Sequence, residues 1–314
     1  MRTFAIGLLF GDDRKDGYAV ADGIAALLEF NWSLRVGACP INLPITSHGK
    51  MLRAGNRLER RILEWADRKR GDLDPRDLLS IVVNSPDERG DAPSDAIIAG
   101  HVPTLFGAAY ETCQNVLIWT LILLTQHADV ARDLYDERRG ALAGDAPTLD
   151  KIADLPLLDA VVKESMRLLP PVPVQMRVAM QQTSLQDHPV PKRGRVVLSP
   201  FLTNRLPELY PDADCFRPAR WATIDPSPFE YAAFSGGPRS CPGFAFGSSV
   251  VKMALAAILM RHRVALAAGA RIDYRVKIAL SPGGPVPAML VPADGAFATT
   301  ELHGTIRDLV RMPA

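Results

Sequence analysis

One stretch of the chain, from about Ser94 to His127, is hydrophobic on every side of a helix instead of on one face. A helix of that kind is buried inside a protein, so the pattern predicts a long central helix over residues 94–127. Ser94 and Asp95 supply the polar start that such a helix needs. Pro103 lies inside it, and we expect a kink there because proline removes one backbone hydrogen bond.

Shorter helices are predicted on both sides of this segment. Residues 1–70 have the pattern of helices broken near Gly11 and across Gly37–Gly49, and a short helix with a charged loop follows over 72–90. The stretch 51–70 is amphipathic, and we interpret its basic face as a solvated one. After the central helix, the pattern predicts helices over 129–140, 155–168 and 244–261.

The hydrophobic pattern changes between Pro171 and Ser199, where short segments of alternating apolar and polar residues predict small strands. A long irregular region follows from Asn204 to Gly243, which is uncommon in a compact domain unless it carries a function. The sequence shows no internal repeat. We therefore predict a mainly α-helical single domain with small β-sheets, covering residues 1–314.

Composition narrows the class of protein. The chain has 314 residues, of which 47% are hydrophobic, with 36 Lys and Arg against 35 Asp and Glu. This balance excludes a disordered chain. The formal net charge of +1 gives no overall attraction for polyanions, so we expect no nucleic-acid partner.

Other patterns bear on location and on metal binding. The segment Met1–Phe10 has a helix end and no cleavage site after it, and Val116–Leu124 is too short to cross a bilayer. The sequence thus predicts a cytoplasmic protein. The four cysteines lie far apart, and this spacing argues against a disulfide scaffold or a zinc module; they are Cys39, Cys113, Cys215 and Cys241.

The strongest chemical signal is the segment Phe234-Ser-Gly-Gly-Pro-Arg-Ser-Cys-Pro-Gly243, just before the last predicted helix. Cys241 there would meet backbone N–H groups and the positive end of the helix dipole, which favour a thiolate. Gly237 and Gly243 permit tight turns that aim these amides at the sulfur, and Phe234 could cover it on one side. Arg239 offers a planar fork for a carboxylate. Together these groups describe the edge of a heme site.

Two other interpretations of Cys241 exist: a small buried apolar residue, or a catalytic nucleophile, for which no histidine partner can be singled out. The flanking residues favour the heme site. Every fixed place of the motif Phe-x-x-Gly-x-Arg-x-Cys-x-Gly is filled, and the chain therefore resembles the cytochrome P-450 family. The resemblance implies that Cys241 is the axial thiolate ligand of heme iron and that Arg239 contacts a heme propionate.

Three more charged residues match the family in order. Glu164 and Arg167 resemble its Glu-x-x-Arg helix, and Arg220 resembles the arginine that completes a Glu/Arg/Arg network. Taken alone, a Glu/Arg pair three residues apart is ordinarily a solvated helix pair. The resemblance implies instead a buried cross-link that holds the scaffold of the cysteine segment, a structural role.

Residues 108–113 resemble the oxygen-activation stretch of the family, with Glu111 and Thr112 as the acid and the alcohol. An acid beside a hydroxyl on a buried helix can relay protons. The alternative is that Thr112 bonds back to the helix backbone while Glu111 reaches solvent. Ala109 and Cys113 depart from the family, which has a glycine and a second hydroxyl residue at these places.

The resemblance also bears on Arg177 and on the start of the chain. Arg177 matches an arginine that the family often places beneath a propionate; the alternative is a surface arginine on an edge strand.

In the family several helices precede the region that residues 1–35 resemble, and this sequence lacks them. A membrane anchor in such a segment is left open.

The resemblance implies a cytochrome P-450 fold without its N-terminal helices and a heme-thiolate monooxygenase. The cofactor would be heme b, with O2 and a small hydrophobic molecule as substrates. Electrons from NAD(P)H would come through a ferredoxin with its reductase or through a flavoprotein reductase, since no dinucleotide fingerprint is present. The alternatives are a peroxide-dependent or isomerising heme-thiolate enzyme and an inactive truncated family member.

Overall fold

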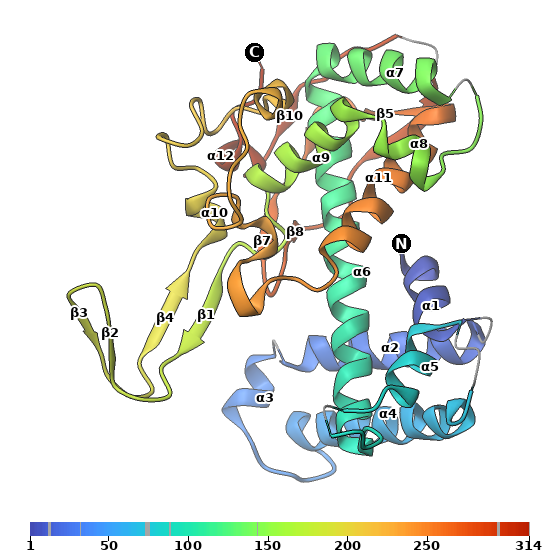
Figure 1. The fold of residues 1–314 in the computed structure, drawn as a ribbon, viewed down its shortest axis with the longest axis vertical. Coiled ribbons are helices and arrows are strands. Elements are labelled where there is room, and N and C mark those ends of the chain that lie inside the picture. Colours follow the sequence, from blue (N-terminus) through green and yellow to red (C-terminus); the bar gives the residue numbers. More distant parts are fainter. Residues whose placement is uncertain are drawn as a thin grey trace. The chain divides into compact units, whose positions relative to one another are not determined.

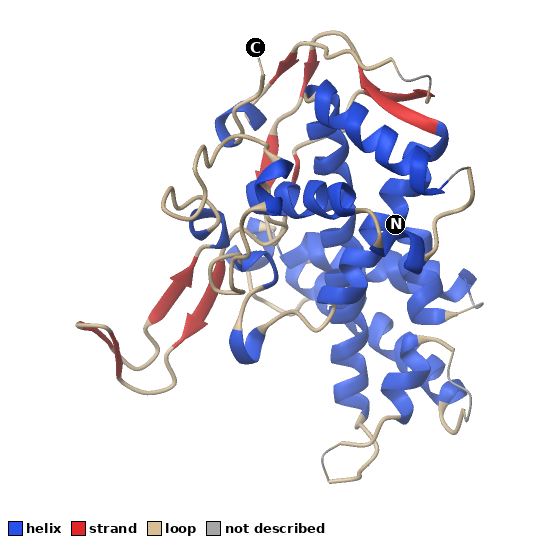
Figure 2. Cartoon of the chain, turned by 45° about the horizontal axis from the view of Figure 1, so that its top comes forward, coloured by secondary structure: helices blue, strands red, loops and turns tan. Residues whose placement is uncertain are grey.

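The computed structural model of this protein describes residues 1–11, 14–31, 33–72, 76–87, 89–142, 144–293 and 296–313. Helices dominate, and the strands among these residues form small two-stranded pairs, as Figures 1 and 2 show. The predicted class, mainly α with small β-sheets, is confirmed. The chain divides into two compact units, residues 1–111 and 112–314. The single domain expected from the sequence stays a prediction.

The first unit is a helical cluster. Phe10 and Trp65 stack at its centre with ring centroids 4.3 Å apart, surrounded by other buried apolar side chains. Its helices are α1 (Arg2–Phe10), α2 (Arg14–Asn31), α3 (Leu34–Ala38), α4 (Ser47–Lys69), α5 (Leu78–Asn84) and the first part of α6 (Asp95–Gln126).

Helix α4 starts earlier than the sequence predicts, within the region expected to be a loop. The hydroxyl of Thr46 accepts a hydrogen bond from the amide of Gly49 at 3.0 Å and so caps the helix. A Cβ at Gly49 would lie 1.9 Å from the carbonyl oxygen of Leu43, so only glycine fits there. The glycine that signals a break in the sequence is here the residue that lets the helix start.

Helix α6 confirms the long predicted helix to within a residue at each end, and it continues through Pro103. The boundary between the two units falls inside it. In the second unit its side chains Trp119, Ile122 and Leu123 are almost fully buried. The indole of Trp119 donates to the carbonyl oxygen of Leu280 at 3.1 Å, which ties the helix to the C-terminal strands.

The second unit contains the remaining helices. Those predicted over 129–140, 155–168 and 244–261 are all present, the last with the predicted ends. The helices are α7 (Ala128–Leu142), α8 (Leu149–Ala153), α9 (Pro156–Leu168), α10 (Pro200–Thr203), α11 (Phe244–Arg261) and α12 (Ile306–Leu309).

Short strands complete this unit. Strands β1 and β4 pair antiparallel, with Gln175 opposite Leu198 and Arg177 opposite Val196, and Figure 1 shows the β2–β3 hairpin at their far end. The strands are β1 (Gln175–Val178), β2 (Thr183–Leu185), β3 (His188–Val190), β4 (Arg195–Leu198), β5 (His262–Leu266), β6 (Ala270–Arg271), β7 (Tyr274–Val276), β8 (Leu280–Pro282), β9 (Ala288–Pro292) and β10 (Leu302–His303).

Helix α11 is also the one helix among the described residues whose length and apolar composition would suffice to cross a membrane, and 17% of it is buried. Core helices of globular proteins meet the same two conditions, so length and composition alone do not place it in a membrane. The sequence pattern had led us to expect no such segment.

Candidate heme-thiolate site

The cysteine segment, residues 234–243, is a tight loop closed by its own backbone. The amide of Cys241 donates to the carbonyl oxygen of Phe234 at 2.8 Å. Two residues inside the loop have positive φ: Ser235 at 60° and Gly237 at 64°. Glycine adopts this conformation without a steric penalty, whereas serine does so rarely. The chain then enters α11, whose first residue, Phe244, donates its amide to the carbonyl oxygen of Cys241.

The thiol of Cys241 is exposed at the end of this loop. Among the described residues its sulfur has no hydrogen-bond partner. A Cβ at Gly243 would lie 3.8 Å from that sulfur, an ordinary van der Waals distance, so Gly243 lies directly beside the thiol. Phe234 packs edge-on against Phe244 with ring centroids 4.9 Å apart. Phe244 is 54% exposed and Phe246 46%, an unusual density of uncovered aromatic surface beside one thiol.

Two arginines that the sequence singled out differ in their surroundings. Arg239 is exposed, and no described side chain forms an ion pair or hydrogen bond with it. Arg177, half-buried on β1, donates to the side-chain Oε1 of Gln175 at 3.2 Å and to the carbonyl oxygen of Met176 at 3.1 Å. The same Oε1 of Gln175 accepts from the Ser235 hydroxyl at 3.1 Å. Sequence reasoning missed Gln175, because no motif marks it.

Helix α6 carries the other candidates. Glu111 and Thr112 are both half-buried on it. The side chain of Thr112 hydrogen-bonds the thiol of Cys113. Asn115, one turn further, is 2% exposed, and its amide nitrogen has no partner among the described residues. The sequence gave no reason to select this asparagine.

Cys113 lies against the start of α11. A Cβ at Gly247 would be 3.6 Å from its sulfur, an ordinary van der Waals distance, so the two helices are closely packed at this point. Burial raises the pKa of the Cys113 thiol; the Thr112 hydrogen bond lowers it, and the nearby charge of Cys241 raises it further. Cys113 is therefore held as a neutral thiol at neutral pH.

The structure brings Glu164, Arg167 and Arg220 together in a buried network. Arg167 donates two hydrogen bonds of 2.9 Å to the carboxylate of Glu164, and Arg220 donates to the same carboxylate at 3.0 Å. Glu164 and Arg167 are fully buried, and Arg220 is 9% exposed. Trp221 and the amide of Arg217 supply the remaining donors to Glu164.

Neighbouring hydrogen bonds extend this network to the cysteine loop. Arg167 also donates to the carbonyl oxygen of Asn204, whose side-chain oxygen accepts from the amide of Ala232 at 2.9 Å. Ala232 begins the 3-10 turn that ends at Phe234. The buried charges therefore anchor the residues from which the loop starts.

The donor set of this site fits a heme. One exposed thiol is available as an axial sulfur ligand, and exposed aromatic rings beside it offer apolar contact. Arg239, which has no acidic partner among the described residues, and Arg177 are suited to carboxylate groups such as propionates.

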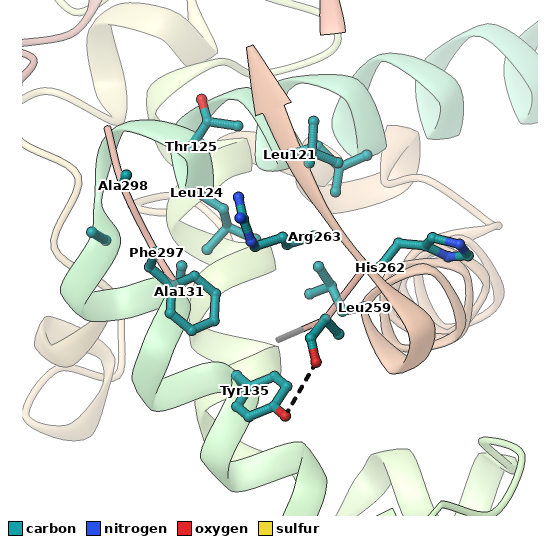
Figure 3. A pocket seen from close by; sticks show the side chains of 13 residues that line it. Leu121, Leu124, Thr125, Ala131, Tyr135, Leu259, His262, Arg263, Phe297 and Ala298 are labelled. Carbon is teal, nitrogen blue, oxygen red and sulfur yellow. Dashed lines mark hydrogen bonds between the residues drawn. The ribbon is translucent and has the colours of Figure 1, made fainter. Parts of the chain in front are cut away.

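A separate cavity lies near the C-terminal ends of α6 and α11, lined by Leu124, Tyr135, Leu259 and Phe297 among others (Figure 3). Its volume is about 40 Å³. Pockets for small organic ligands are typically about 300–1,000 Å³. The cavity is therefore too small for an organic substrate, and its residues are distinct from those of the cysteine loop.

Comparison with known proteins agrees with this site. The sequence model of the family described as Cytochrome P-450 matches residues 6–282. The chain is 34% identical, over 70% of its length, to the cytochrome P-450 monooxygenase sphH of Aspergillus fumigatus, and 31% identical, over 78% of its length, to the pentalenene oxygenase of Streptomyces avermitilis. It spans 42% of the first relative and 54% of the second, about half the length of the proteins it matches.

Similarity of fold is equally clear. The solved structure of a cyanobacterial CYP120A1 with bound retinoic acid superimposes with a TM-score of 0.79 at 26% identity. The match covers 93% of this chain and 68% of that one.

Proposed function

Because this chain belongs to the cytochrome P-450 family, we propose that it carries the heme-thiolate site of a monooxygenase, which inserts one oxygen atom of O2 into a small hydrophobic substrate. The observation that carries the proposal is the exposed thiol of Cys241, at the end of a loop that its own backbone closes. Heme b, when bound, would supply the activation of oxygen.

The chain's own residues would hold and serve that group. Cys241 would bind the iron through sulfur, and Arg239 and Arg177 would pair with the propionates. Gly237 shapes the loop, and the buried Glu164 network holds its start. Glu111 and Thr112 would hold and pass protons toward the oxygen site.

Electrons would reach the site from NAD(P)H through a separate ferredoxin or flavoprotein reductase. The substrate would be apolar, as is usual for pockets with few polar groups. The cytoplasmic location predicted from the sequence stays part of this proposal.

The test is a reduced carbon-monoxide difference spectrum of the purified, heme-loaded protein. We expect the band of a thiolate-ligated heme in the wild type and its loss in Cys241→Ser, because a serine oxygen is a harder, poorer ligand for the iron. Cys39→Ser, a change at an exposed cysteine in the other unit, is the matched control and should keep the band. Absence of the band from folded wild-type protein would contradict the proposal and favour an inactive family member.

One observation supports a second function. Cys113 replaces the second hydroxyl residue of the oxygen-activation stretch, and its thiol engages the side chain of Thr112. The sulfur of Cys113 is a weaker hydrogen-bond acceptor than a hydroxyl oxygen. Turnover with hydrogen peroxide but none with reductase and NAD(P)H would select a peroxide-dependent enzyme over a monooxygenase.

A further inference from the structure

Gln175 links two parts of the site that would hold heme, strand β1 and the cysteine loop. Its side-chain oxygen accepts one hydrogen bond from Arg177, on the same strand, and one from Ser235, in the cysteine loop. The two donors are 58 residues apart in the sequence but share one acceptor atom. Gln175 is half-buried, so these bonds are partly shielded from water.

Strand geometry explains the first bond. Side chains two residues apart on a strand share a face, which places Gln175 and Arg177 together. The burial pattern of β1 follows this alternation, because Gln175 and Arg177 are half-buried while Met176 and Val178 are exposed. No described acidic residue forms an ion pair with Arg177, so the direction of its guanidinium depends on the oxygen of Gln175 and on the carbonyl oxygen of Met176.

Loop geometry explains why the second bond matters. Ser235 has φ 60° and ψ −175°, a region of backbone conformation that is essentially reserved for glycine. A residue keeps such a conformation only when its surroundings hold it there. The hydroxyl bond to Gln175 is one such restraint, and it acts six residues before Cys241.

We propose that Gln175 is a positioning residue that couples the propionate-binding arginine, Arg177, to the conformation of the thiolate loop through Ser235. This inference rests on the proposed function, since it assigns Gln175 a role toward the same heme. An amide oxygen with two donors fixes both at once, whereas an arginine and a loop held separately would respond independently to heme.

The first experiment compares Gln175→Leu with Gln175→Glu in the heme-loaded protein. Leucine removes the acceptor, and we expect heme to transfer to apomyoglobin about 10- to 100-fold faster, the range typical of lost outer partners of a metal site. Glutamate keeps an acceptor oxygen for both donors and should restore slow transfer. Gln182→Leu, an exposed position beyond the end of β1, is the matched control and should behave as the wild type.

The second experiment is a double-mutant cycle with Ser235→Ala, which removes the hydroxyl alone. If Gln175 acts on the loop through Ser235, the two changes together should accelerate heme transfer little more than Gln175→Leu does alone. If the fold-accelerations of the two single variants instead multiply in the double variant, the two residues act independently and the coupling is overturned. Ser235→Gly, which also relieves the unusual backbone conformation, provides a variant that folds if the alanine variant does not.

The heme reduction potential gives a second readout, which reports the charge beside the propionates, and Gln175→Glu should return it toward the wild-type value. A guanidinium held beside the propionates favours the more negatively charged reduced heme, so its displacement in Gln175→Leu should shift the potential to more negative values. An unchanged potential together with wild-type heme transfer would overturn the inference. Absence of the thiolate-ligated band from the wild type would contradict the proposed function itself. If the wild type shows the band and Gln175→Leu matches the wild type in heme transfer and potential, only the present inference is contradicted.

Discussion

The protein uses the reactive side chains of Glu164 and Cys241 in opposite ways. Glu164 is fully buried, and its carboxylate accepts five hydrogen bonds, two of them from Arg167. The hydrogen-bonding capacity of its carboxylate is taken up by donors of the protein itself, which suits a structural role. Cys241 is exposed, and its sulfur is without a hydrogen-bond partner among the described residues. A side chain that is positioned by its backbone but not engaged by its neighbours is available to a ligand.

Replacing Glu164 by glutamine should destabilise the protein severely. The change keeps the shape but leaves Arg167 and Arg220 buried without a compensating charge, and breaking a buried pair in this way costs about 3–5 kcal/mol. Urea denaturation should show this loss in the free energy of unfolding, and heme retention should fall with it. Glu208→Gln, at an exposed glutamate, is the control. A loss below about 1 kcal/mol, as for a solvated pair, would contradict the scaffold role.

Replacing Gly237 by alanine tests the loop conformation. A side chain there meets no atom within 4 Å, but φ is +64°, and a left-handed conformation costs a residue with a Cβ about 1–2 kcal/mol. We expect that loss in the free energy of unfolding. Gly284→Ala, where space is equally open and φ is not in the positive range, should change little. Equal effects of the two substitutions would show that the backbone of Gly237 is not restrained.

At the scale of secondary-structure elements, an ion pair joins α9 to α11. Asp159 on α9 accepts from Lys252 on α11 at 2.9 Å and pairs with Lys163 at 2.7 Å. Burial acts to raise the pKa of Asp159, but the hydrogen bonds and charges of the two lysines outweigh it, so the pKa lies below its usual value. The link holds the helix that starts at the cysteine loop against the helix that carries Glu164.

This link should give stability that depends on pH. Because the folded pKa of Asp159 is depressed, its contribution is present above the unfolded value of about 3.9 and is lost as the pH falls through the folded pKa. Asp159→Asn should lower the free energy of unfolding by about 0.2–1 kcal/mol at pH 7, the range of partly exposed pairs. The difference from the wild type should vanish in acid. Asp225→Asn, at an exposed aspartate outside the helices and strands, is the control, and a difference that persists in acid would refute the assignment.

At the scale of the whole molecule, exposed apolar side chains occur at many places, and two aromatic ones lie where the cysteine loop meets α11. Phe244 and Phe246 are each about half exposed there, next to the cysteine loop. Exposed apolar patches mark binding sites for ligands, membranes or other chains. The adjacent sulfur and arginines favour heme as the ligand that covers this surface.

Adding heme should therefore hide apolar surface and stabilise the protein. At free heme 100 times its dissociation constant, the free energy of unfolding should rise by about 2.7 kcal/mol. The fluorescence of the apolar dye ANS should fall in parallel, since its binding surface is covered. Stabilisation without loss of ANS fluorescence would place heme elsewhere.

The sequence by itself determined the helices and the chemistry of the loop. The apolar pattern predicted the ends of α6 and α11 closely, because a nearly continuous apolar segment leaves a signal that every one of its residues carries. The motif around Cys241 and the order of Glu164, Arg167 and Arg220 identified the family. The Cys241 motif is local, so it can be read without knowing which distant segments meet.

Only the tertiary structure decided which side chains meet across long separations. Gln175 and Ser235 have no sequence signal, since their bond depends on a strand and a loop being brought together. The early start of α4 depends on a glycine packed under the carbonyl of Leu43, where the sequence pattern indicated only a break. Hydrophobic periodicity reports whether a residue is buried, but not against what, because burial has no direction along the chain whereas hydrogen bonds join particular pairs of atoms.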